Sequence, residues 1–151
     1  MKQIDVAIAV VTRGARILIC QRKLEDTFGG LWEFPGGKCE AGEQLEQCLA
    51  RELMEELGIE ARVVRKLTEI RHEYPHTLLT LHPYLCELSS GEPQPIESQR
   101  VKWVKSQELG RFRFPPANKA LLNELRRSHE NINATAETPR PQRQTQRRKF
   151  K

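Results

Sequence analysis

Residues 37–59 read GKCEAGEQLEQCLARELMEELGI, and this stretch carries the strongest structural signal in the chain. From Gln44 to Leu57 it contains neither Gly nor Pro and is rich in Leu, Glu, Gln and Ala, which favour helices. Gly58 stands where a helix commonly ends. Leucines recur every four residues, which predicts a helix with one apolar stripe formed by Leu45, Leu49, Leu53 and Leu57.

Three glutamates of this helix are expected to share one face. Glu52, Glu55 and Glu56 stand at i, i+3 and i+4, so they project within an arc of about 100°. Carboxylates this close repel one another unless a cation lies among them, and a hard divalent ion accepts oxygen ligands. The alternative is a solvated acidic face. The adjacent leucine stripe and the glycine-rich approach at residues 34–37 favour the metal site.

The stretch resembles the signature of the Nudix hydrolases. That signature is Gly, five residues, Glu, seven residues, Arg-Glu, an aliphatic residue, any residue, Glu-Glu, any residue, Gly and an aliphatic residue. Its defined positions are all filled, by Gly37, Glu43, Arg51, Glu52, Leu53, Glu55, Glu56, Gly58 and Ile59. The resemblance implies an α/β (α+β) Nudix fold, a mixed β-sheet sandwiched between α-helices. It also implies that Mg²⁺, with Mn²⁺ as a substitute, is held on a pyrophosphate.

The resemblance further implies which residues hold the metal and which perform the chemistry. Arg51 would orient the glutamates by pairing with Glu43 or Glu55. One carboxylate must accept the proton of the attacking water. Glu52 is the expected base, and Glu97 in a later loop is its competitor, although a surface charge is an equally good interpretation of Glu97. The implied metal ligands are the Gly36 carbonyl, Glu52, Glu55, Glu56 and Glu97, and the implied catalytic set is Arg51, Glu52, Glu56 and Glu97.

Two further segments, LWEFPGGK at 31–38 and FPPAN at 114–118, resemble the MutT branch of the family, which hydrolyses 8-oxo-dGTP. In that branch the Asn after Phe-Pro-Pro-Ala reads the edge of the oxidised guanine, a role that Asn118 takes by resemblance. A helix-cap or surface amide is the alternative for Asn118. Thr77 stands where MutT-type sequences usually have Arg, so one nucleotide contact is absent or supplied elsewhere. The implied substrate-binding residues are Arg22, Glu33, Phe34, Pro35, Gly36, Tyr74 and Asn118.

Three functions are consistent with these residues. The first is an 8-oxo-dGTP diphosphatase, which would release 8-oxo-dGMP and pyrophosphate and so protect DNA replication from oxidised nucleotides. The second keeps the fold and metal but changes the base, as in a CTP or broad (d)NTP pyrophosphohydrolase. The third is a non-catalytic module that binds 8-oxoguanine, against which the complete set of glutamates argues.

The rest of the chain predicts one Nudix domain over residues 1–128 and a disordered basic tail over 129–151. The net charge is +5, and the segment from residue 130 onward contains six basic and two acidic residues. Such a tail can contact nucleic acid weakly and without sequence preference, or merely aid solubility. Strands are expected over 4–12, 17–20, 31–34, 61–70, 77–88 and 101–104, and a second helix over 116–127.

The four cysteines contain no Cys-x-x-Cys pair. Two disulfides are possible, but three of the cysteines lie in or beside apolar stretches, so all four are expected to be reduced. No segment approaches the roughly 18 apolar residues of a membrane span, and the first residues lack a secretory apolar region. A cytoplasmic protein without membrane contact is therefore expected, and a monomer.

Overall fold

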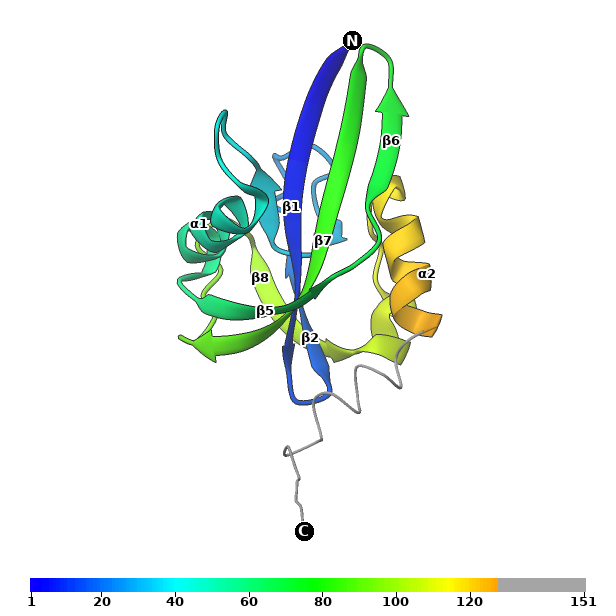
Figure 1. The fold of residues 1–151 in the computed structure, drawn as a ribbon. Helices are drawn as coiled ribbons and strands as arrows, with labels where there is room; N and C mark the ends of the chain where they lie inside the picture. The colour runs from blue at the N-terminus through cyan, green and yellow to red at the C-terminus, as the bar shows by residue number, and fades with distance from the viewer. Residues whose placement is uncertain (128–151) are drawn as a thin grey trace.

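The computed structural model describes residues 1–127. Eight strands form one mixed sheet, and two helices, α1 (Leu45–Leu57) and α2 (Lys119–Arg127), lie on opposite sides of it (Figure 1). This confirms the predicted α/β architecture. The predicted tail over 129–151, with its expected nucleic-acid contact, lies outside the described residues. Within those residues, no helix is long and apolar enough to cross a membrane.

The central strand β1 (Lys2–Arg13) has partners of both orientations. It turns at Gly14 (φ +60°) into β2 (Arg16–Gln21), and the two pair antiparallel. The predicted hairpin is therefore confirmed. On its other side β1 pairs parallel with β7 (Thr77–Ser90) over eleven residue pairs, from Lys2 with Thr77 to Thr12 with Glu87. The sheet is mixed because these two neighbours of β1 run in opposite directions.

The remaining strands pair around this centre, and they differ from prediction in two places. The expected strand over 61–70 is broken, because Leu67 leaves the strand and buries its side chain. The chain also pairs with β1 at Gly36–Lys38, where glycines predicted only a stop; a Cβ at Gly36 would lie 2.1 Å from the Ala7 carbonyl oxygen. The strands are β3 (Trp32–Glu33) and β8 (Arg100–Lys105) on β2, β4 (Gly36–Lys38) on β1, and β5 (Glu60–Lys66) and β6 (Ile70–Tyr74) on β7.

Two apolar layers enclose the sheet. Alternate residues of β1 enter different layers, as strand geometry requires: Ala7 and Ala9 face one, Ile8 and Val10 the other. The leucine stripe of α1 packs into the first layer, and Leu121 and Leu125 of α2 into the second. Burial of the stripe fixes the rotation of α1 and therefore the direction in which its glutamates project.

Local contacts explain where α1 begins and ends, and a 3₁₀ turn sets the start of α2. At the start of α1 the Gln44 N–H donates to Gln47 Oε1 at 3.1 Å. At its end Gly58 adopts φ +69° and its N–H donates to the Met54 carbonyl at 3.0 Å, which confirms the predicted terminal glycine. The second helix was predicted from Pro116, but a 3₁₀ turn, η2 (Pro116–Asn118), precedes α2. A further 3₁₀ segment, η1 (Ser106–Arg111), was not predicted.

Candidate active site

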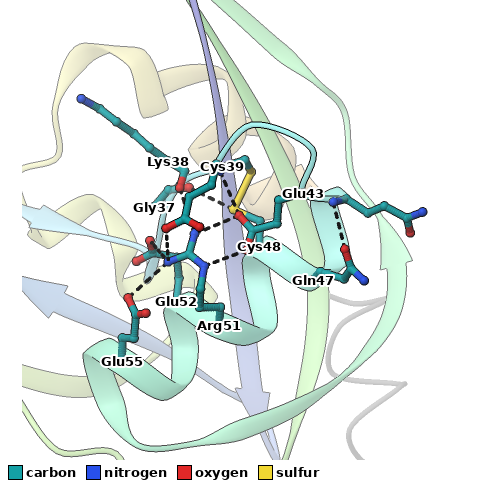
Figure 2. A network of polar contacts seen from close by, with 11 residues as sticks. Gly37, Lys38, Cys39, Glu43, Gln47, Cys48, Arg51, Glu52 and Glu55 are labelled. Atoms are coloured by element: carbon teal, nitrogen blue, oxygen red, sulfur yellow. Dashed lines mark hydrogen bonds and ion pairs between the residues drawn. A yellow bond between two sulfur atoms is a disulfide. The ribbon is translucent and has the colours of Figure 1, made fainter.

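Arg51 is the centre of an ion-pair network on α1 (Figure 2). Its Nε and Nη2 donate to the two carboxylate oxygens of Glu43 at 2.7 and 2.9 Å. Its Nη1 donates to Glu52 at 3.0 Å and to Glu55 at 3.2 Å. Arg51 therefore pairs with both of the partners expected for it, and one guanidinium draws together the loop before α1 and two carboxylates of the helix.

Glu56 points away from this network, into a cavity of about 210 Å³. One of its carboxylate oxygens accepts the backbone N–H of Gly36 at 3.2 Å, so the β4 backbone fixes its position. Glu33 and Glu97 lie on the same cavity. We call this cavity the acidic pocket; it is lined by Cys20, Arg22, Asp26, Glu33, Glu56, Glu97 and Ser98.

The acidic pocket favours protonated carboxyl groups. Burial, and then the negative charges of Glu33, Glu52 and Glu97, raise the pKa of Glu56 to about 8, although the Gly36 N–H opposes the shift. Burial also raises the pKa of Glu33, while the Arg22 guanidinium, 2.7 Å away, acts in the other direction. The pocket thus contains more negative charge than its own cations neutralise.

The loop that carries Glu97 is fixed to the end of α1. The N–H of Gln94 donates to the Leu57 carbonyl at 3.0 Å, and that of Ile96 to the Glu56 carbonyl at 3.2 Å. These bonds satisfy carbonyls that a helix end leaves without partners. At the root of the loop, a Cβ on Gly91 would lie 2.7 Å from the Gly58 carbonyl oxygen, so the two glycines permit close contact. The loop therefore presents Glu97 to the same pocket as Glu56.

The donor set of the pocket fits a hard divalent cation. Its carboxylates line one cavity, where burial and neighbouring negative charges raise the pKa of Glu56, and a bound cation would relieve this repulsion. The expected ligands are not gathered in advance, because Glu52 and Glu55 turn toward Arg51. Over residues 1–127, the only three potential ligands within 4.8 Å of one another are Cys39, Glu43 and Cys48. Binding at the helix glutamates would therefore require Glu52 or Glu55 to leave Arg51.

This combination of helix, pocket and loop agrees with the comparison with family models. The model for the NUDIX domain matches residues 6–124. The chain belongs to the Nudix hydrolase family. Members of this family hydrolyse pyrophosphate bonds and generally use divalent cations, so the resemblance found in the helix signature is confirmed.

Curated relatives of this Nudix hydrolase carry two different activities in their names. A CTP pyrophosphohydrolase of Escherichia coli is 38% identical over 122 residues, covering 81% of this chain and 90% of that protein. An 8-oxo-dGTP diphosphatase of the same species is 34% identical over 128 residues (84% and 99%). Another from Haemophilus influenzae is 37% identical over 132 residues (87% and 97%).

Solved structures agree with the fold. The solution structure of the Escherichia coli ORF135 protein superposes with a TM-score of 0.76 at 34% identity, covering 87% of this chain and 94% of that one. The crystal structure of a MutT Nudix hydrolase from Burkholderia pseudomallei gives a TM-score of 0.71 at 26% identity, with 83% and 99% covered. The chain is thus a MutT-like Nudix hydrolase in both sequence and fold.

The Nudix fold distributes the expected substrate residues over two faces of the sheet. Arg22 and Glu33 pair at 2.7 Å in the acidic pocket. Phe34, 3% exposed, belongs to the apolar layer of α2, with its ring 5.2 Å from that of Phe114. Asn118 is also buried, beside Ala117 of the same layer.

The other three expected residues have separate positions. The Pro35 carbonyl accepts the Ala9 N–H at 2.8 Å, and Gly36 pairs with Ile8, so both belong to the β1–β4 contact. Tyr74 stands on β6 with its ring 4.6 Å from that of His72, and it does not line the acidic pocket. Arg22 and Glu33 therefore line the acidic pocket together with Glu56 and Glu97, whereas Tyr74 lies outside it.

One expectation about the site was wrong. Cys39 and Cys48 form a disulfide, whereas all four cysteines were expected to be reduced; Cys20 and Cys86 are indeed free and buried. The helical period places Cys48 beside the buried leucine stripe, but it does not show that the preceding loop returns to that position. Asp26 and Ser98 of the acidic pocket were missed for the same reason, since non-periodic loops supply both.

Proposed function

We propose that this Nudix hydrolase is an 8-oxo-dGTP diphosphatase that uses Mg²⁺ and releases 8-oxo-dGMP and pyrophosphate. The observation that carries the choice of base is the amide of Asn118. This residue is only 9% exposed, and within the described part of the chain its side chain forms no hydrogen bond. An amide that is not engaged within the protein is available to a ligand, and a purine edge offers both donors and acceptors to it. Two of the relatives bear this activity in their names.

The residues of the chain divide the proposed chemistry among them. Glu56, with Gly36 and the helix glutamates, would hold the cation. When bound, Mg²⁺ would neutralise phosphate oxygens and make water more acidic. Arg22 lines the same pocket and pairs with Glu33. It would leave Glu33 in order to bind the phosphates. The carboxylates of the pocket would then face the attacked phosphorus.

Glu97 is the general base that the geometry favours. It is exposed and lies on the acidic pocket, so it is accessible to water. Glu52, the base expected from the resemblance, is held by Arg51 at 3.0 Å and is 14% exposed at its side chain. The two assignments separate on a pH–rate profile, because only loss of the base removes the acidic limb. We expect Glu97→Gln to remove this limb and Glu52→Gln to raise chiefly the Mg²⁺ requirement.

A CTP pyrophosphohydrolase is the second candidate. A relative with that name is 38% identical, and Thr77 replaces the arginine usual in MutT-type sequences. In this alternative Asn118 would contact a pyrimidine. The choice concerns only the base, since both reactions use the same pocket.

A nucleotide panel tests the proposal. With Mg²⁺ present, kcat/KM is measured for 8-oxo-dGTP, dGTP, CTP and dCTP, and the products are identified as pyrophosphate or phosphate. We expect 8-oxo-dGTP to exceed dGTP at least about tenfold, the scale that one or two well-placed hydrogen bonds supply. Equal values for 8-oxo-dGTP and dGTP would exclude the first candidate, and a clear preference for CTP would establish the second. Inactivity on every nucleotide would favour a binding module.

The proposed enzyme acts on free nucleotides. That it acts as a monomer is also part of the proposal. Its location in the cytoplasm, where nucleotides are used for replication, is part of the proposal.

A further inference from the structure

The disulfide between Cys39 and Cys48 joins the signature loop to the signature helix. Cys39 follows β4 directly, and Cys48 lies in the first turns of α1, nine residues later (Figure 2). The covalent link therefore closes the loop that carries Glu43. Nothing in the Nudix signature requires a cysteine at either position.

The disulfide shares its surroundings with the Arg51 network. A carboxylate oxygen of Glu43 lies within 4.8 Å of both sulfur atoms. The Cys48 sulfur also lies 3.6 Å from the Gly37 carbonyl oxygen, and Arg51 Nη2 donates to the Lys38 carbonyl at 3.2 Å. The segment from Gly37 to Glu43 is thus attached to α1 by one covalent bond and several polar contacts.

This segment affects the geometry of the metal-binding residues. Gly37 lies so close to Glu52 that an added Cβ would come within 2.4 Å of the Glu52 carboxyl carbon. Gly36, next to it, holds Glu56 through its N–H. If this segment moved, the positions of the Glu52 and Glu56 carboxylates would therefore change.

The cysteines differ in access. Cys39 is partly exposed, whereas Cys48 is completely buried. Cys20 and Cys86 are 3% and 0% exposed, and burial raises the pKa of the Cys86 thiol to about 12 and that of Cys20 further still. In the folded protein a dissolved thiol can therefore reach the disulfide from the Cys39 side, while the two free cysteines are shielded.

We propose that Cys39–Cys48 is a redox-responsive site which undergoes exchange with small thiols of the glutathione class, and that its reduction weakens divalent-cation binding by the signature helix. The inference goes beyond the proposed function, because it does not depend on which nucleotide is hydrolysed. Reduction frees the segment from Gly37 to Glu43, and cation binding must then order this segment again. Ordering even one backbone residue corresponds to a loss in affinity of about fivefold.

The exchange is chemically balanced. A thiolate attacks the Cys39 sulfur, a new S–S bond forms, and the bond between the cysteines breaks, with its electron pair and one proton going to Cys48. A second thiolate attacks the mixed disulfide, which releases the oxidised small molecule and leaves Cys39 as a thiol after protonation. Oxidised glutathione reverses both steps.

Thiol counting tests the exchange. The native chain is treated with oxidised or reduced glutathione, labelled with iodoacetamide, and analysed by peptide mass spectrometry. We expect Cys39 to be labelled in the folded chain only after reduction. The buried thiols of Cys20 and Cys86 should be labelled only after denaturation, and that of Cys48 only after both reduction and denaturation. Labelling of Cys39 and Cys48 that is unaffected by either form of glutathione would overturn the redox site.

Cation binding tests the consequence. Free Mn²⁺ is titrated with oxidised and with reduced protein and measured by electron paramagnetic resonance, without nucleotide. We expect reduction to raise the dissociation constant about fivefold. A Cys39→Ser/Cys48→Ser double variant should bind like the reduced protein in both conditions, and a Cys86→Ser variant should retain the redox response. Equal Mn²⁺ affinity of the oxidised and reduced wild-type protein would refute the coupling, and inactivity toward 8-oxo-dGTP would leave this result unaffected.

Discussion

Arg51 holds both carboxylate oxygens of Glu43, at 2.7 and 2.9 Å. Hydrogen bonds from Arg51, with a smaller contribution from the Glu40 backbone N–H, lower the pKa of Glu43 to about 2. Glu43 therefore keeps its charge at any pH at which the enzyme would work. Two nitrogen atoms of the guanidinium are occupied in this way, which leaves Nη1 to bind Glu52 and Glu55. Glu43 therefore helps to position these two helix glutamates through Arg51.

We expect Arg51→Lys to lower kcat/KM roughly 10- to 100-fold, because an ammonium group cannot bind Glu43 with two parallel bonds and also reach Glu52 and Glu55. Steady-state hydrolysis of the best nucleotide measures this effect. Arg13→Lys is the matched control, since Arg13 forms an exposed ion pair with Glu92 at 3.0 Å. Wild-type kinetics in Arg51→Lys would show that the network is not needed.

The raised pKa of Glu56 predicts how stability changes with pH. Because the folded-state pKa is about 8, above the ordinary 4.5, the folded protein binds more protons than the unfolded chain between these values. Glu56 therefore destabilises the metal-free fold increasingly as pH rises from about 4.5 to about 8. Summed over that range, we expect a contribution of roughly 2–4 kcal/mol.

Urea unfolding in EDTA at several pH values measures this contribution. Glu56→Gln should become more stable than the wild type as pH rises, while Glu60→Gln, an exposed glutamate on β5, should follow the wild type throughout. Parallel pH curves for Glu56→Gln and the wild type would contradict the expected titration.

Gly37→Ala should reduce activity more than stability. The new Cβ would lie 2.4 Å from the Glu52 carboxyl carbon, and the flexible end of that side chain would have to move away. We expect kcat/KM to fall roughly tenfold or more, because small displacements of catalytic groups lower the rate strongly. The melting temperature should change by only about a few degrees. Gly110→Ala is the control, as its Cβ would meet only the end of the Arg126 side chain. A normal Mg²⁺ requirement and rate in Gly37→Ala would disprove the steric coupling.

Asn118→Ala should abolish discrimination between bases. If the amide reads 8-oxoguanine, the preference for 8-oxo-dGTP over dGTP should fall at least about tenfold, with much smaller change for dGTP alone. Competition between the two nucleotides measures this ratio directly. Asn123→Ala, which removes an amide that accepts from Arg126 on α2, should retain the wild-type ratio. An unchanged ratio in Asn118→Ala would assign base selection to other residues.

Reduction of the disulfide should lower stability independently of any effect on cation binding. Closing a loop with a sequence separation of 9 restricts the unfolded chain, which contributes about 2–3 kcal/mol. Urea unfolding with and without reductant measures this difference. The Cys39→Ser/Cys48→Ser variant should unfold identically in both solutions, and a reductant effect in that variant would show that another group is responsible.

The sequence predicted the elements whose period is regular. The leucine stripe identified α1 and its terminal glycine, and the β-branched run before Gly14 identified the hairpin of β1 and β2. Burial decided where the expected strand over 61–70 is broken, since Leu67 leaves the sheet to reach the apolar layer of α2. Local pattern cannot show such a break, because the residues against which Leu67 packs are distant in sequence.

The candidate site was predictable to a similar extent. The spacing of Glu52, Glu55 and Glu56 placed them on one helix. It did not predict that Arg51 binds the first two while the Gly36 N–H binds the third. Loop residues such as Asp26 and Ser98 have no periodic signal. The pairing of Cys39 with Cys48 depends on how the loop returns to the helix, which is a property of the folded chain.

The parallel pairing of β1 with β7 also determines when the protein can fold during synthesis. Lys2 to Thr12 are synthesised well before their partners on one side, Thr77 to Glu87. Until those residues emerge, the apolar run of β1 has an open edge, which is a hazard for aggregation. Contacts of such long sequence separation also slow folding. Helix α1 is synthesised before β7 and β8, but the sheet on which it packs can be completed only after both of these strands have been translated.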